Sequence, residues 1–91
     1  MAEITPSVAL RGFGNPATLL PACRRIEKLG YRRLWFVEVS DVDVFAMSAA
    51  AAQITDRIQL ASGVANSYLR LPTLTAMAAA TVSSLSGGRF T

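Results

Sequence analysis

Residues 34–64 read LWFVEVSDVDVFAMSAAAAQITDRIQLASGV, and this stretch decides the fold class. It opens with four consecutive apolar residues, 34–37, a run typical of a parallel strand buried on both faces. A helical segment follows over 44–54, with Asp41 or Asp43 as its N-cap and four alanines that favour helix. A second strand is predicted over 58–64. Strand, helix and strand of these lengths predict a right-handed crossover between parallel strands, and therefore an α/β fold.

The same alternation precedes this stretch. A strand is predicted over residues 4–10 and a helix over 18–29, in which apolar side chains recur at helical spacing. Thr18 is its predicted N-cap. Pro21 then falls in the first turn, where a missing N–H has no intrahelical partner, and Gly30 ends the helix.

The alternation also continues toward the C-terminus. Pro72 is well placed at the first position of a third helix, which we expect to run to about Leu85 and to stop at Gly87-Gly88. Residues 89–91 fall where a fourth strand would begin. We therefore expect residues 1–91 to form a single incomplete domain of about three βα units and the start of a fourth strand.

The composition indicates that another surface covers part of this domain. Hydrophobic residues make up 52% of the chain and charged residues only 16%, whereas soluble domains carry about 25% charged residues. A sheet of three strands also leaves open edges. We expect either a homo-oligomer, in which the chain is a non-catalytic self-associating module, or association with the remainder of a larger barrel.

Several classes of function are excluded or disfavoured. The chain contains no histidine and one cysteine, Cys23, so it cannot by itself supply a Cys/His zinc site or a Ser-His or Cys-His pair. Cys23 falls in the first helix and is predicted to be a buried, inert thiol. The arginine pairs 24–25 and 32–33 have no neighbouring basic cluster or interleaved aromatic residues and are interpreted as solvated, which argues against nucleic acid. No membrane span or signal peptide is expected, and the expected location is cytoplasmic.

A dinucleotide site is the first candidate function. Residues 12–17, Gly-Phe-Gly-Asn-Pro-Ala, fit the G-x-G-x-x-G/A pattern between a strand and a helix, and Glu38 lies where an acid could hold a ribose. However, Pro16 and Pro21 remove backbone N–H groups that a pyrophosphate would need. A Rossmann-type NAD-binding unit is therefore the weaker interpretation.

A more specific signal lies downstream. Residues 63–72, Gly-Val-Ala-Asn-Ser-Tyr-Leu-Arg-Leu-Pro, together with 76–81 and 85–91, resemble the luciferase-like superfamily of flavin and deazaflavin oxidoreductases. The chain is most similar to methylenetetrahydromethanopterin reductase-like members, and residues 29–31 and 34–38 resemble their second-strand region. The resemblance covers nearly the whole chain. It implies the N-terminal part of a TIM (β/α)₈ barrel, a fragment of a family domain several times longer.

The resemblance also implies a cofactor and its contacts. Family members use FMN or coenzyme F420 for monooxygenation or hydride transfer on small molecules, and the third-strand loop slightly favours F420. The family often has a non-prolyl cis peptide at the end of the third strand, which corresponds to Gly63-Val64. The implied cofactor-binding positions are Glu38, Gly63, Val64 and Asn66.

Glu38 is the one catalytic candidate, and its role is open. Family members carry Asp or Glu at this position, commonly followed by histidine, whereas Val39 follows here. Glu38 could act as an acid or hydrogen-bond the cofactor, or it could cap the loop or pair with an arginine. Arg70 could bind a phosphate or a carboxylate or be structural. No metal site is expected, and we expect the 91-residue chain to be inactive on its own.

Overall fold

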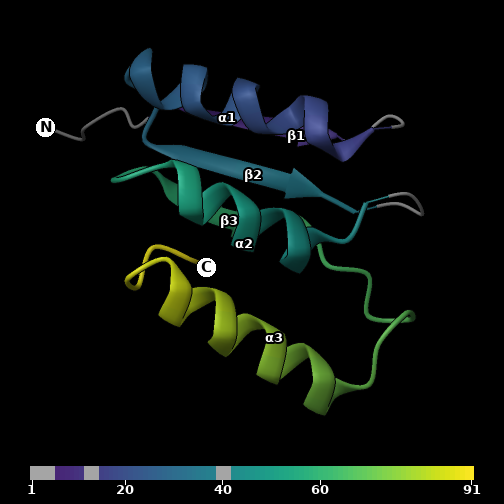
Figure 1. Ribbon diagram of the computed structural model, residues 1–91. Helices are drawn as coiled ribbons and strands as arrows, with labels where there is room; N and C mark the ends of the chain where they lie inside the picture. The colour runs from purple at the N-terminus through teal and green to yellow at the C-terminus, as the bar shows by residue number, and fades with distance from the viewer. Residues whose placement is uncertain (1–5, 12–14, 39–41) are drawn as a thin grey trace, which may run out of the picture.

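The computed structural model describes residues 6–11, 15–38 and 42–91. Three parallel strands lie in the order β1-β2-β3, and three α-helices run along one face of the sheet (Figure 1). The elements are β1 (Ser7–Arg11), the short 3₁₀ helix η1 (Pro16–Thr18), α1 (Leu19–Lys28), β2 (Arg33–Val37), α2 (Val44–Ile54), β3 (Gln59–Ser62) and α3 (Pro72–Leu85). The predicted α/β alternation is confirmed.

The C-terminal residues begin a fourth strand at the free edge of β3. Leu60 forms a parallel bridge with Phe90. The N–H of Leu60 donates to the carbonyl of Arg89, and the N–H of Thr91 donates to the carbonyl of Leu60, both at 2.8 Å. In a doubly wound dinucleotide fold the fourth strand would lie beside the first strand instead. Continuation beyond β3 is the order of a barrel wound in one direction.

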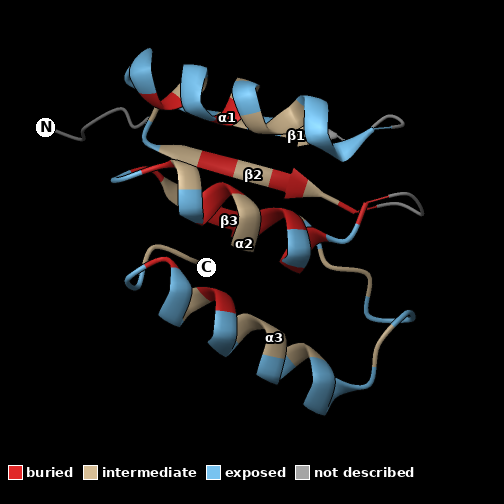
Figure 2. Ribbon diagram, in the orientation of Figure 1, coloured by how far each residue is buried: buried red, intermediate tan, exposed pale blue. Residues whose placement is uncertain are grey.

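The hydrophobic core lies between the sheet and the helices. Leu34 and Phe36 of β2 and Leu60 of β3 point into it and are at most 2% exposed, and Cys23 of α1 is fully buried there, as predicted. Burial raises the pKa of the Cys23 thiol to about 11, so the thiol stays protonated and inert. Figure 2 shows these buried stretches on β2 and on the inner sides of the helices.

The second face of the sheet is only partly covered. Burial alternates along β2, with Leu34 and Phe36 buried and with Trp35 and Val37, which follow them, half-buried. The prediction of burial on both faces was therefore wrong for this chain. In a TIM barrel this face of the sheet lines the interior and is covered by the strands opposite. The strands described here form only one side of such a barrel, so this face stays partly open.

Helix boundaries follow local hydrogen bonds. Asp43 caps α2, because its Oδ2 accepts a hydrogen bond from the N–H of Ala46 at 2.8 Å. Asp41, the other candidate, lies outside the described residues. Pro72 begins α3, and Gly30, Gly87 and Gly88 adopt positive φ after the helices that they end.

The start of α1 differs from the prediction. Residues 16–18 form a 3₁₀ turn first, capped by Asn15 through a 3.0 Å hydrogen bond from the N–H of Ala17. Thr18 occupies the N-cap position of α1 but makes no capping bond with its side chain. Its hydroxyl donates instead to the carbonyl of Asn15 at 2.7 Å, so the predicted N-cap position is confirmed but its side chain does not cap the helix. Residues 12–14, which hold both glycines of the dinucleotide-like pattern, lie outside the described part of the chain.

Candidate functional site

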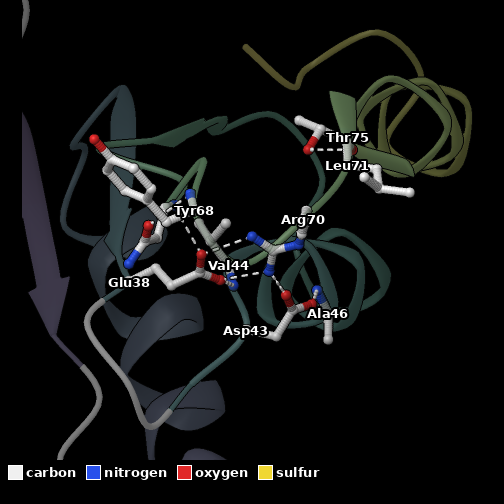
Figure 3. Close-up of polar contacts among 9 residues, drawn as sticks. Glu38, Asp43, Val44, Ala46, Tyr68, Arg70, Leu71 and Thr75 are labelled. Atoms are coloured by element: carbon white, nitrogen blue, oxygen red, sulfur yellow. Dashed lines mark hydrogen bonds and ion pairs between the residues drawn. The ribbon is translucent and has the colours of Figure 1, made fainter. Parts of the chain in front are cut away.

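The candidate site lies at the carboxyl ends of β2 and β3, the edge at which TIM-barrel active sites are built. Glu38 directly follows β2, and the segment 63–71, here called the β3–α3 loop, follows β3. Asp43 and Val44 approach from the start of α2. Figure 3 shows the side chains of Glu38, Asp43 and Arg70 converging on one another.

The Glu38 carboxylate accepts four hydrogen bonds. Two come from the Arg70 guanidinium, Nη1 to Oε1 at 2.7 Å and Nη2 to Oε2 at 2.6 Å. The N–H of Asn66 donates to Oε1 and the N–H of Val44 donates to Oε2, both at 2.9 Å. The Glu38 side chain is only 3% exposed. It therefore joins the end of β2, the start of α2 and the β3–α3 loop.

These contacts determine the protonation state of Glu38. The hydrogen bonds from Arg70 are the main cause that lowers the pKa of Glu38 to about 2, helped by the N–H groups of Val44 and Asn66 and opposed by burial. A carboxyl group with this pKa is ionised at neutral pH and has no proton to give as a general acid. Of the alternatives left open by the sequence, pairing with an arginine is confirmed.

Arg70 is held from three sides. Besides Glu38 it forms an ion pair with Asp43 Oδ1, and its guanidinium carbon lies 4.8 Å from the centroid of the Phe45 ring. The Arg70 side chain is 11% exposed, and its pKa is raised, chiefly by the hydrogen bonds to Glu38. Arg70 therefore ties the β3–α3 loop to the start of α2, and the edge formed by its Nη1 and Nη2 atoms is engaged by carboxylates.

Asn66 turns the loop. Its backbone N–H is held by Glu38, its Oδ1 accepts a hydrogen bond from the N–H of Tyr68 at 3.0 Å, and its carbonyl accepts one from the N–H of Leu69 at 3.2 Å. The turn leaves the Tyr68 side chain 98% exposed. The backbone at Asn66 is thus fixed at the strand ends, and contact of its side chain with a cofactor stays a prediction.

The Gly63–Val64 peptide bond is cis, at the position that the family resemblance implied. The N–H of Gly63 still donates to the carbonyl of Phe36 at 2.8 Å, so the chain leaves the sheet only after this residue. The Val64 side chain is 71% exposed. An exposed apolar side chain thus lies at the carboxyl ends of the strands.

Replacing Gly63 by alanine is expected to destabilise the protein by about 1–3 kcal/mol, the usual cost of overpacking. A Cβ at this position would lie 2.7 Å from Cε3 of Trp35, which packs under the strand end. Urea unfolding of Gly63→Ala, alone and combined with Trp35→Leu, measures the effect. The smaller side chain at position 35 should recover part of the loss; equal losses in both backgrounds would contradict this contact.

The stability of the chain is expected to fall as the pH is lowered from 4.5, the ordinary pKa of Glu38, to about 2, its pKa in the fold. A lowered carboxyl pKa stabilises the folded state above the unfolded-state pKa, and Glu38 contributes about 3 kcal/mol that is lost across this window. Glu27, whose pKa is also lowered, acts in the same direction. Urea midpoints from pH 7 to pH 3 test this, and the decline should be clearly smaller in Arg70→Met. An identical decline in that variant would contradict the assignment to Glu38.

Two other features bear on the class of site. Within residues 6–11, 15–38 and 42–91, no group of three or more Cys, Asp or Glu side chains could hold a metal ion. Among the helices described, none is long and apolar enough to cross a bilayer.

Residues 3–91 match the family described as luciferase-like monooxygenase. The chain belongs to this family. A curated relative, the 5,10-methylenetetrahydromethanopterin reductase of Methanopyrus kandleri, is 30% identical over 90 residues, which are 98% of this chain and 26% of the relative. The fold and family predicted from residues 29–38 and 63–91 are therefore confirmed.

Solved structures agree. The coenzyme F420-dependent tetrahydromethanopterin reductase of Methanopyrus kandleri superposes with a TM-score of 0.89 and 29% identity, over 98% of this chain and 26% of that protein. A monooxygenase from Streptomyces bottropensis gives a TM-score of 0.71 at 23% identity, over 85% and 27%, which shows the shared fold. This luciferase-like chain thus spans about a quarter of the length of these relatives and forms part of a barrel.

Proposed function

We propose that this chain is the N-terminal segment of a luciferase-like oxidoreductase that uses a flavin-type cofactor, with coenzyme F420 favoured over FMN. The observation that carries the proposal is the Glu38–Arg70 pair, which holds the β3–α3 loop at the carboxyl ends of β2 and β3. The F420-dependent reductase among the similar structures supports the choice of cofactor. Coenzyme F420, when bound, supplies hydride-transfer chemistry.

The residues present fit one wall of such a site. Val64 offers an exposed apolar surface against which a flat ring could pack, beside Gly63. Glu38 is engaged by four donors and Arg70 by two carboxylates, so both act as positioning residues that hold the loop rather than as contacts to the cofactor. Contacts of Gly63, Val64 and Asn66 with the cofactor are part of this proposal.

The chain alone is expected to show no turnover. Because it offers one wall of the site, it provides few contacts to orient a cofactor or a substrate, and orientation contributes a large share of catalysis. The test compares the rates at which reduced F420 and reduced FMN are oxidised in the presence of the purified 91-residue chain and in buffer alone. Saturable turnover above background by this chain would contradict the proposal of inactivity.

Complementation tests the proposed role in the larger barrel. The chain is mixed with a polypeptide that carries the remaining βα units of the Methanopyrus kandleri reductase. Binding of F420 is measured by the change in its fluorescence. We expect saturable binding only in the mixture, and weaker binding when Arg70 is replaced by methionine. A defined complex of the two polypeptides that binds neither F420 nor FMN would overturn the assignment.

A second candidate function is a self-associating, non-catalytic βα module. It is favoured by α3, which contains no charged residue, although Leu74, Met77 and Leu85 on it are 53%, 61% and 51% exposed. An uncharged outer face is unusual for a helix in contact with water. Light scattering separates the two candidates: a monodisperse oligomer that binds no F420, FMN or NAD would favour the module.

A further inference from the structure

A second hollow lies at the opposite edge of the sheet from Glu38. It is a cavity of about 700 Å³ at the amino-terminal ends of β2 and β3. Its lining includes Arg32 and Arg33 at the start of β2, Arg57 and Gln59 at the start of β3, and Tyr31. This volume lies in the range of small-molecule sites in proteins.

The charged side chains that line this cavity are all positive. Three of its lining residues are arginines, and no acidic residue among those that the structure describes lines it. Glu27, the buried acid nearest in the fold, is already engaged. Its Oε2 accepts hydrogen bonds from the N–H groups of Asp56, Arg57 and Ile58 at 3.0, 2.8 and 2.9 Å. Among the described residues no carboxylate forms an ion pair with Arg32 or Arg33. Arg57 is partly engaged, because its Nη2 donates to the backbone carbonyl of Glu27 at 3.1 Å.

Arg33 has unused hydrogen-bonding capacity. Its Nε is buried and has no hydrogen-bond partner among the described residues. Its guanidinium carbon lies 5.6 Å from the centroid of the Trp35 ring, which holds the side chain over the open face of the sheet. A buried N–H of this kind is costly to leave unpaired, so an incoming acceptor gains from pairing with it.

We propose that this cavity binds a phosphate group, either free or carried by a larger organic molecule. A guanidinium presents a planar fork of donors that matches the oxygens of a phosphate. Three such groups around one hollow concentrate positive potential there and attract a multivalent anion. Gln59 and Tyr31 add polar side chains beside them. This edge lies across the sheet from the Glu38 site, so the proposal stands or falls independently of the proposed oxidoreductase.

Calorimetric titration of the whole 91-residue chain with inorganic pyrophosphate, ADP and adenosine, at low salt, tests the proposal. We expect saturable one-to-one binding of pyrophosphate and no binding of adenosine. ADP binding much more tightly than pyrophosphate would assign the phosphate to a larger molecule, and equal affinity would assign a free phosphate or pyrophosphate.

Variants locate the site. The double substitution Arg33→Gln with Arg57→Gln should weaken pyrophosphate binding at least tenfold, whereas Arg24→Gln, an exposed arginine of α1 outside the cavity, should leave it unchanged. If the double variant does not fold, Arg32→Gln replaces it, because the Arg32 side chain is exposed. The absence of pyrophosphate binding to the unaltered chain, or equal losses in Arg24→Gln and in the cavity variants, would overturn the proposal.

Discussion

Replacing Arg70 by methionine is expected to lower the free energy of unfolding by about 3–5 kcal/mol, the cost of leaving a buried charge without its partner. Arg70 supplies two of the four hydrogen bonds that Glu38 accepts, and both side chains are nearly buried. Methionine keeps the aliphatic length but leaves the Glu38 carboxylate with only two backbone N–H groups. Urea unfolding at pH 7 measures the loss.

Two further variants make this expectation specific. Arg24→Met removes an exposed arginine and should change stability by less than about 0.5 kcal/mol. Arg70→Met combined with Glu38→Gln removes both charges but keeps an acceptor oxygen for the N–H groups of Val44 and Asn66, and should recover much of the loss, because no buried charge is left without its partner. If Arg70→Met prevents folding, Arg70→Lys, which keeps the charge but not the bidentate fork, should lie between it and the unaltered protein. A loss in Arg70→Met no larger than in Arg24→Met would contradict the account of the site.

Replacing Glu27 by alanine is expected to destabilise the chain by about 3 kcal/mol, since it leaves three backbone donors without their acceptor, and the donor of Ile58 is buried. Glu27 lies in α1 and is 7% exposed. Its carboxylate accepts hydrogen bonds from three successive N–H groups, those of residues 56–58, where the chain enters β3. Ile58 is 1% exposed, so water cannot replace the lost acceptor there.

The controls for Glu27 use the same turn. Asp56→Ala removes an exposed carboxylate from this turn and should be nearly neutral. Glu27→Gln keeps one acceptor oxygen without the charge and should fall between alanine and glutamate. Thermal and urea unfolding of the three variants measure the order. Equal stability of Glu27→Ala and Asp56→Ala would show that the N–H groups of residues 56–58 do not depend on Glu27.

The parts of the fold that local chemistry determines could be predicted from the sequence. The bounds of α2 and the start of α3 follow from Asp43 and Pro72, whose effects act within one helical turn. The end of β3 was placed two residues too late, at Val64 instead of Ser62. The Gly63–Val64 bond that follows is cis, and periodicity carries no signal for this.

The site was predicted less completely than the fold. The position of Glu38 at a strand end was readable from the apolar run before it, and the family resemblance pointed to Gly63 and Asn66. The pairing of Glu38 with Arg70 spans 32 residues, and a single sequence leaves such distant contacts open. Arg32 and Arg33 were interpreted as solvated, because nothing in the sequence shows that they line one cavity together with Arg57.

The most direct test of the central claim is the hydrogen-exchange rate of the Asn66 backbone amide. The claim is that Glu38 and Arg70 hold the β3–α3 loop at the carboxyl ends of the strands. The N–H of Asn66 donates the hydrogen bond that joins the loop backbone to Glu38 Oε1. We predict clear protection of Asn66 in the unaltered chain and its loss in Arg70→Met, with the N–H of Leu60 in the sheet still protected. Exchange of Asn66 at the rate of an open loop in the unaltered chain would contradict the account.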